Sequence, residues 1–120
     1  MTLTLYVDGG TKGSVICLVD DSNGYIVVKK KRISTNNELE YFAVIFGIEY
    51  AKKHYLRKNV TINSDSKLIV NQINGKWNIN MDTLLILNKR ALRKLKDNIK
   101  IKWIPREKNL AGIHLEELMK

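Results

Sequence analysis

The segment TNNELEYFAVIFGIEYA, residues 35–51, decides the fold because the spacing of apolar residues changes at its start from that of β-strands to that of an α-helix. Its apolar residues recur at the spacing of an α-helix, at Leu39, Ala43, Phe46 and Tyr50. We therefore predict a helix over residues 37–55, with Asn36 or Asn37 as its N-cap. The segments on either side show the alternation typical of β-strands, so the chain combines both kinds of element.

Strands are predicted both before and after this helix. Alternation and the turn-rich sequence DDSNG predict an opening group of strands, at residues 2–8, 13–19 and 25–34. The later predicted elements are a strand at 59–65, a helix at 66–74 closed by Gly75, a helix around Leu84–Leu95, a strand at 99–105 and a helix at 110–120. The order β-β-β-α-β-α-α-β-α predicts an α/β fold whose five-stranded mixed sheet, three strands antiparallel and two parallel, is flanked by helices. The length suits one domain, residues 1–120.

The charge balance points to a polyanionic partner. Lys and Arg number 21 against 12 Asp and Glu, which gives a net charge of +9. Such an excess attracts nucleic acids at long range, although a basic surface without a partner, or one that meets an anionic membrane, would have the same composition. The charge is densest in KKKR, residues 29–32, and NKRALRKLK, residues 88–96. In the latter, Lys89, Arg93 and Lys96 share one helical face, which either follows phosphates or is merely solvated.

Nothing in the sequence predicts export or membrane insertion. The N-terminus lacks the basic head and apolar run of a signal peptide, and no segment is apolar for long enough to span a bilayer. The single cysteine, Cys17, lies in the apolar segment SVICLV and cannot form an internal disulfide. We expect a cytoplasmic protein that uses no membrane and no obligatory protein partner.

Two aspartates end predicted strands that a right-handed crossover would place side by side. Asp8 closes TLTLYVD and Asp65 closes TINSD, so both carboxylates are expected at one rim of the sheet. Neighbouring carboxylates repel each other unless a cation lies between them, and hard divalent cations prefer oxygen ligands. The alternative is that each aspartate only caps the adjoining helix or turn, as Asp65 could do before SKLIVNQ.

Two glutamates, Glu38 and Glu40, stand at the head of the predicted helix. At about 100° per residue they fall on opposite flanks of its apolar stripe. The flank of Glu40 continues through Val44, Gly47 and Ala51, whereas that of Glu38 is polar. Glu40 is therefore predicted to be the partly buried carboxylate, which needs a partner.

Four segments, taken together, resemble the type 1 ribonuclease H family, particularly its short archaeal and reverse-transcriptase-like branch. They are YVDGG, TNNELEYFAVIFGIEYA, INSDSKLIVNQINGKW and IKWIPREKN, and they span nearly the whole chain in the family's order. The resemblance implies a ribonuclease H-like fold and an endonuclease that hydrolyses the RNA strand of RNA·DNA hybrids with two Mg²⁺ ions. It implies that Asp8, Glu40 and Asp65 are the catalytic residues and hold the metal.

The same resemblance implies residues that contact the hybrid. Thr35 matches a position near a phosphate, and Asn36 and Asn37 match positions that contact the minor groove. A helix cap is the alternative role of all three residues. Lys76 and Trp77 are expected to take part of the role of a basic segment that this chain lacks, unless Trp77 is buried. The full expected set is Gly9, Gly10, Thr35, Asn36, Asn37, Lys76, Trp77, Lys89 and Arg93.

The chain departs from the family where the fourth carboxylate is expected. In PREKNLAGIHLEEL an ungapped match places Ile113 at that position, and a shift by one residue places Gly112 there. The expected substitutes are His114, Glu116 or Glu117, or water, and we expect activity that is weakened or shifted toward Mn²⁺. The alternatives are a catalytically weak or inactive module that binds hybrids or other duplexes, and a nuclease of this fold that acts on another nucleic acid.

Overall fold

The structure, a computed structural model, describes residues 2–10 and 12–120. Its strands are β1 (Leu3–Gly10), β2 (Val15–Asp20), β3 (Tyr25–Lys30), β4 (Val60–Ser64) and β5 (Ile99–Trp103). Its helices are α1 (Asn36–His54), α2 (Lys67–Ile73), α3 (Asp82–Lys94) and α4 (Leu110–Leu118), with the short 3₁₀ helix η1 (Arg106–Lys108) before α4. The predicted element order is confirmed, and η1 is the addition to it. Among the described residues no helix has the length and apolar character needed to cross a membrane.

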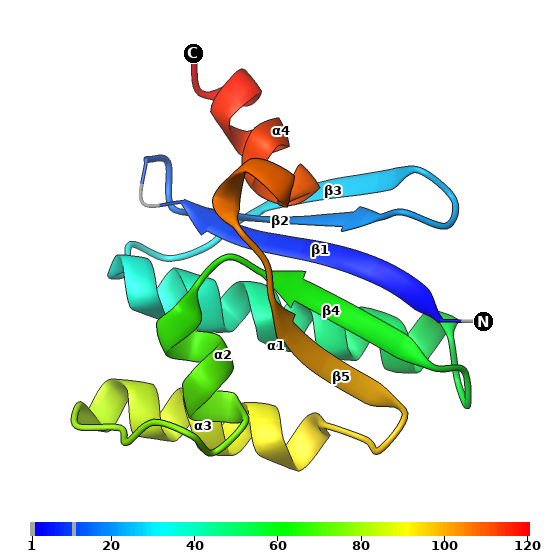
Figure 1. The fold of residues 1–120 in the computed structure, drawn as a ribbon. Coiled ribbons are helices and arrows are strands. Elements are labelled where there is room, and N and C mark those ends of the chain that lie inside the picture. The colour runs from blue at the N-terminus through cyan, green and yellow to red at the C-terminus, as the bar shows by residue number, and fades with distance from the viewer. Residues whose placement is uncertain (1, 11) are drawn as a thin grey trace.

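The strands form the predicted five-stranded mixed sheet, in the order β3-β2-β1-β4-β5. β2 runs antiparallel to both β1 and β3, whereas β1, β4 and β5 run parallel (Figure 1). In the central parallel pair Leu5 lies opposite Ile62 and Tyr6 opposite Asn63. The carboxyl ends of β1 and β4 therefore meet at one edge of the sheet, as the crossover argument predicts.

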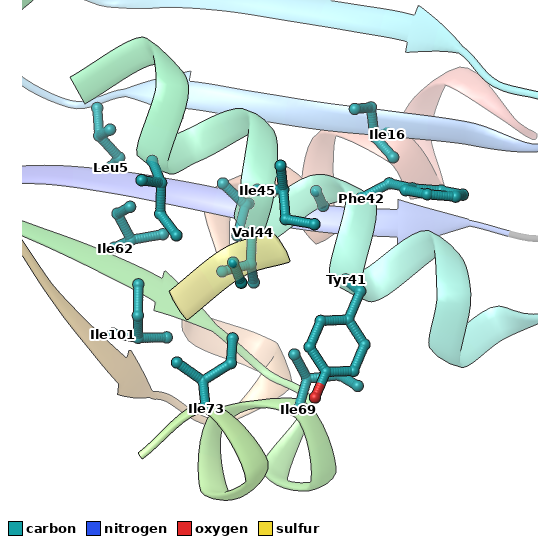
Figure 2. Close-up of a cluster of buried hydrophobic side chains, with 14 of the residues drawn as sticks. Leu5, Ile16, Tyr41, Phe42, Val44, Ile45, Ile62, Ile69, Ile73 and Ile101 are labelled. Carbon is teal, nitrogen blue, oxygen red and sulfur yellow. The ribbon is translucent and has the colours of Figure 1, made fainter. Parts of the chain in front are cut away.

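Both faces of the sheet are covered. Ile16 and Leu18 of β2 face the main core beneath α1, where they lie among the apolar side chains of α1, α2 and the parallel strands (Figure 2). The alternating residues Cys17 and Val19 face the other way, into a smaller cluster beneath α4. β2 is buried along its whole length for this reason, and α1 and α4 lie on opposite faces of the sheet.

The N-cap of α1 is Thr35, so the predicted caps Asn36 and Asn37 are wrong by one or two residues. The Thr35 hydroxyl accepts a hydrogen bond from the Glu38 amide at 3.2 Å, and the Glu38 carboxylate accepts one from the Thr35 amide at 2.9 Å. This reciprocal pair satisfies two amides at the helix start, which either asparagine alone would not do.

Several strand ends also differ from the prediction: β2 begins at Val15 instead of residue 13, β5 ends at Trp103 instead of residue 105, and the ends of β1 and β3 are displaced too. β1 continues to Gly10 because its glycines pair with β2, with Gly9 opposite Ile16 and Gly10 opposite Val15. β3 ends at Lys30 instead of residue 34, because among the described residues the pairing with β2 continues beyond it only through the Lys31 amide, which donates to the Ser14 carbonyl. Glycines and a run of lysines are weak indicators of strands, which explains the errors at β1 and β3.

The start of α1 touches the end of β1 at Gly9. A Cβ atom on Gly9 would lie 2.6 Å from both the carbonyl carbon and the carbonyl oxygen of Leu39, and 2.9 Å from the amide nitrogen of Glu40. These are backbone atoms inside a helix and cannot rotate away. A Cβ atom on the next residue, Gly10, would meet only side chains, at 3.8 Å or more. The sequence VDGG thus contains one obligatory glycine and one replaceable glycine.

We predict that Gly9→Ala destabilises the protein by about 3 kcal/mol, because α1 must shift away from β1 to admit the methyl group. Gly10→Ala is the matched control and should change the free energy of unfolding by less than about 1 kcal/mol. Urea unfolding followed by circular dichroism measures both values. Equal effects of the two substitutions would contradict the close contact.

Candidate functional site

Three carboxylates from distant parts of the sequence meet at the carboxyl ends of β1 and β4. Asp8 lies on β1, Glu40 on the first turns of α1 and Asp65 directly after β4, and one oxygen of each lies within 4.8 Å of the others. Asp8 and Glu40 are buried, and Asp65 is partly buried. The predicted meeting of these residues is confirmed. Asp65 does not cap α2, because the Ser66 hydroxyl accepts the hydrogen bond from the Ile69 amide at 3.3 Å.

The partner of Glu40 is the backbone of β1. The Gly9 amide donates a hydrogen bond of 2.8 Å to Glu40 Oε1, and this bond is buried. Glu38 instead lies at the surface, in the capping pair with Thr35. The prediction that Glu40, and not Glu38, is the buried carboxylate, made from the small and apolar residues on its flank, is therefore confirmed. The contact between Gly9 and α1 is what brings the Glu40 carboxylate to Asp8.

Asp65 is positioned by two residues that sequence analysis did not single out. The fully buried side chain of Asn109 donates from Nδ2 to Asp65 Oδ2 and to the Val7 carbonyl, both at 3.0 Å. Asn109 Oδ1 accepts from the Ala111 amide at 3.1 Å and so caps α4. Trp103 Nε1 donates to the Asp65 carbonyl at 3.1 Å. The role of Asn109 as a helix cap could have been predicted, because an asparagine directly before the apolar helical segment LAGIHL is a typical N-cap pattern.

Burial and the neighbouring negative charges disfavour the ionised forms of Asp8 and Glu40. Burial, followed by the negative charge of Asp65, raises the pKa of Asp8 above its ordinary value. Burial and the charge of Asp8 raise the pKa of Glu40 further, to about 9, although the Gly9 amide opposes this shift. Without a cation the site therefore holds a proton on Glu40 at neutral pH. A bound cation would reverse this balance, since it favours the ionised carboxylates.

Gly112 occupies the place opposite the carboxylates. A Cβ atom on Gly112 would lie 3.3 Å from Asp8 Oδ2 and 3.4 Å from Asp65 Oδ2, whereas the neighbouring Ile113 is exposed. Of the two positions considered for the fourth carboxylate, the structure thus identifies Gly112 as the one that faces the cluster. A cavity of about 250 Å³ lies beside it, between α4, Glu40 and Asn36.

Among the expected substitutes for that carboxylate, Glu116 alone lines this cavity within the part of the chain that the structure describes. Its Oε1 accepts from Arg106 Nε at 3.3 Å and pairs with Arg106 Nη2 at 3.2 Å. Arg106 also lines the cavity, and the charges of Asp65 and Asp8 help to raise the pKa of its guanidinium against the effect of burial. Glu117 pairs with Lys120 instead, and His114 lies outside the cavity lining.

A family model described as reverse transcriptase-like matches residues 5–115. The chain belongs to this family. Among solved structures, LC11-RNase H1, isolated from compost by a metagenomic approach, superposes with a TM-score of 0.81 at 25% identity, covering 99% of each chain. The N-terminal RNase H domain of Rv2228c from Mycobacterium tuberculosis gives a TM-score of 0.77 at 26% identity, covering 98% of this chain and 93% of that one. RNase H1 from Halobacterium salinarum gives 0.74 at 27%, covering 96% and 94%.

These matches confirm the predicted resemblance to ribonuclease H and its fold. A curated relative, bifunctional protein Rv2228c of Mycobacterium tuberculosis, is 29% identical over 120 aligned positions, which cover 91% of this chain. They cover 33% of that relative, so the chain spans about a third of its length. The shared part is thus one region of a longer protein in Mycobacterium tuberculosis.

The residues expected to contact nucleic acid fall into two groups in this member of the reverse transcriptase-like family. Gly9, Gly10 and Asn36 line the cavity beside the carboxylates, and Thr35 and Asn37 adjoin Asn36 at the start of α1. The second group is exposed on the α2–α3 connection and on α3, at Lys76, Trp77, Lys89 and Arg93. Trp77 is 48% exposed, so its alternative assignment to the core is wrong.

The raised pKa of Glu40 predicts a pH-dependent stability of the metal-free protein. Between the ordinary value of 4.5 and about 9, folded Glu40 keeps a proton that the unfolded chain releases, so the free energy of unfolding falls as pH rises. Glu40→Gln removes this contribution. From about pH 5.5 to about pH 8.5 in EDTA, the wild type should lose at least about 1 kcal/mol relative to Glu40→Gln in urea unfolding.

Glu38→Gln is the control on the same helix, since glutamine can still form the capping pair. The pKa of Glu38 lies below its ordinary value because of its bonds to Thr35, so its contribution to stability is already complete above about pH 5. Its profile should run parallel to that of the wild type. Parallel profiles for Glu40→Gln and the wild type would refute a protonated Glu40.

Proposed function

We propose that this protein is a divalent-metal-dependent endonuclease that hydrolyses the RNA strand of RNA·DNA hybrids, with Asp8, Glu40 and Asp65 as its catalytic residues. The observation that carries the proposal is the cluster of three carboxylates, two buried and one partly buried, at the carboxyl ends of β1 and β4 within a ribonuclease H fold. Mutually repelling carboxylates without a cation lower stability, so their placement together is explained by a ligand that neutralises them.

The residues present fit a hard divalent cation. Their donors are carboxylate oxygens, which suit Mg²⁺ and Mn²⁺ and leave soft metals disfavoured. The hydrogen bonds from Gly9 to Glu40 and from Asn109 to Asp65 orient two of the three carboxylates before any ion binds. Bound as a pair, such ions would supply an activated water and neutralise the charge that develops on the scissile phosphate.

The three residues then share one task. Asp8, Glu40 and Asp65 would hold the ions through their carboxylate oxygens. Glu40 must release its proton when the site is loaded, since its pKa is raised in the empty cluster by burial and by Asp8. The Gly9 amide remains a donor to the ionised form of Glu40 and so favours that release.

The hybrid as substrate is supported by three observations. The net charge of +9 favours a polyanion. Asn36 lines the cavity at the carboxylates, where its amide can donate to and accept from the 2′-hydroxyls of RNA. A second structure of LC11-RNase H1, which superposes with a TM-score of 0.77 at 23% identity, is that of its complex with an RNA/DNA hybrid.

The resemblance to ribonuclease H implies that the fourth carboxylate holds the ion that activates the attacking water, and this nucleophile side is the weak part of the site. Gly112 offers no ligand where the fourth carboxylate would stand, and Glu116 faces the same cavity but is engaged by Arg106. We therefore assign the remaining oxygen ligand on this side to Glu116 or to water. A site held by fewer carboxylates should favour Mn²⁺, which binds most sites more tightly than Mg²⁺.

The direct test is cleavage of an end-labelled RNA·DNA hybrid in Mg²⁺ and, separately, in Mn²⁺. The wild type should cut the RNA strand only with metal and faster in Mn²⁺, and Asp65→Asn should be slower by a factor of at least about 100. Duplex DNA and duplex RNA of the same sequence serve as controls. No cleavage with hybrid binding intact would leave a binding module, and equal cleavage of another duplex would change the substrate.

Gly112→Asp should restore the fourth carboxylate. Its Cβ atom fits if the Asp8 and Asp65 side chains move by a few tenths of an ångström. We predict about tenfold faster cleavage in Mg²⁺ than for the wild type, and lower thermal stability in EDTA because a further charge joins the cluster.

Gly112→Asn is the matched control, with the same shape and no charge. Mg²⁺ should raise the melting temperature of Gly112→Asp more than that of Gly112→Asn, because the added ligand tightens metal binding. Indistinguishable responses of the two variants to Mg²⁺ would show that residue 112 does not face the metal site.

A further inference from the structure

A second surface of the protein, distinct from the carboxylate cluster, is a groove between β3 and α1. Two adjoining cavities of about 910 Å³ and 580 Å³ form it, and they share Lys29, Phe46 and Glu49 as lining residues. We call it the β3–α1 groove. The cavity of about 910 Å³ is its basic part, and the other is its aromatic part.

The groove follows from the periodicities of its two walls. Alternate residues of β3, namely Tyr25, Val27 and Lys29, face α1. On α1, one flank of the helix lines the groove, from Phe42 through Phe46 and Tyr50 to His54. β3 is an edge strand, so this side of the groove is open to solvent.

The basic part collects charge from sequence segments that lie far apart. Residues Lys29–Arg32 meet Arg90 and Lys94 of α3 there. Lys29 Nζ lies 4.6 Å from the centre of the Phe46 ring, and Lys31 Nζ lies 5.3 Å from that of Phe42. Among the described residues that line either part, Glu49 is the single acidic one, and Lys94 already pairs with it at 3.2 Å. The groove thus has a large excess of positive charge.

The aromatic part is a rigid stacked surface. The Tyr25 and Tyr50 rings are nearly parallel, with centres 5.9 Å apart, and the His54 ring lies 4.3 Å from Tyr50. Buried Asp20 accepts a hydrogen bond from the Tyr50 hydroxyl at 2.7 Å, which holds this ring in place. Tyr25 is 49% exposed and has one side of its ring occupied by Tyr50. A flat, exposed ring of this kind is suited to stacking with a nucleobase.

The groove begins near the carboxylates and leads away from them. Arg32 is three residues before Thr35, the N-cap of α1, and Asn36 lines the cavity at the cluster. From there the groove follows α1 from Phe42 to His54, a distance of about 18 Å at 1.5 Å per residue. Along a duplex each strand has one phosphate per about 3.4 Å, and a single strand is more extended, so the groove accommodates at most about five nucleotides of one strand.

We propose that the β3–α1 groove binds a single-stranded extension of the hybrid that is being cleaved, with its phosphates along the basic part and a base stacked on Tyr25. The proposal rests on the proposed function for its substrate. A positive groove combined with aromatic rings is the arrangement by which proteins bind single strands without sequence preference. Lysines on an edge strand also prevent strand pairing between molecules, but that role explains neither Arg90 and Lys94 on α3 nor the stacked tyrosines.

The experiment compares two hybrids, one blunt and one with an oligothymidine DNA extension of about five nucleotides. Fluorescence anisotropy measures their affinity for the Asp65→Asn protein, without divalent metal, over a range of salt concentrations. The extension should raise the affinity at least about tenfold and make the slope of log K against log salt steeper by about 2, which corresponds to about three of its phosphates neutralised at about 0.7 each. An RNA extension of the same length shows whether the sugar matters.

Paired variants locate the effect. Lys29→Gln with Arg90→Gln removes two charges from the groove, whereas Lys100→Gln with Lys102→Gln removes two exposed charges from β5, the opposite edge strand. The groove pair should abolish most of the extra salt dependence, and the β5 pair should preserve it. Tyr25→Ala should lower affinity for the extended hybrid about tenfold without changing the slope, because stacking involves no ions.

The blunt hybrid separates this proposal from the proposed function. Groove variants should bind and cleave it like the unmodified protein, and matching unfolding curves confirm that they fold. An extension without effect, or equal losses for the groove pair and the β5 pair, would overturn the groove proposal even if cleavage is normal. Absence of cleavage would overturn the proposed function, while the binding comparison, made with an Asp65→Asn protein, would still decide the role of the groove.

Discussion

The contact on which the rest of the site depends is the one between Gly9 and the first turn of α1. A residue with a side chain fits at this position only if α1 moves away, because its Cβ atom would otherwise lie 2.6 Å from the backbone of Leu39. The close approach lets the Gly9 amide bond to Glu40, and this bond brings the Glu40 carboxylate beside Asp8. The parallel pairing of β1 with β4 then supplies Asp65 at the same edge. A backbone contact thus decides where the chemistry can occur.

The cluster is held together against its own electrostatics. Burial and mutual repulsion raise the pKa values of Asp8 and Glu40, so the folded protein without a cation holds these groups at a cost in stability. The apolar clusters on the two faces of the sheet, together with Asn109, provide the rigidity that keeps the carboxylates near one another. Gly112 limits the repulsion by adding no further charge, and in the proposed mechanism the same feature weakens the nucleophile side. Stability without metal and strength of metal binding are therefore opposed at this one position.

Much of this arrangement could be predicted because it depends on periodicity. The mixed sheet and the burial of Glu40 both follow from the spacing of apolar residues along the strands and along α1. The remaining features depend on contacts between distant segments. Thr35 and its neighbours were all acceptable caps, and only the reciprocal bonds with Glu38 decide among them. Choosing between Gly112 and Ile113 depends on which side of α4 faces the carboxylates, and the sequence does not give this orientation. The role of Asn109 depends on its contact with Asp65, which is distant in the sequence.

Crystals of the protein grown with Mn²⁺ would show whether the carboxylate cluster is a divalent-cation site. Anomalous diffraction should place Mn²⁺ in contact with oxygens of Asp8, Glu40 and Asp65, with the Gly9 amide still bonded to Glu40. An anomalous map without a peak at the cluster under saturating Mn²⁺, with the three side chains in the positions described, would contradict the account.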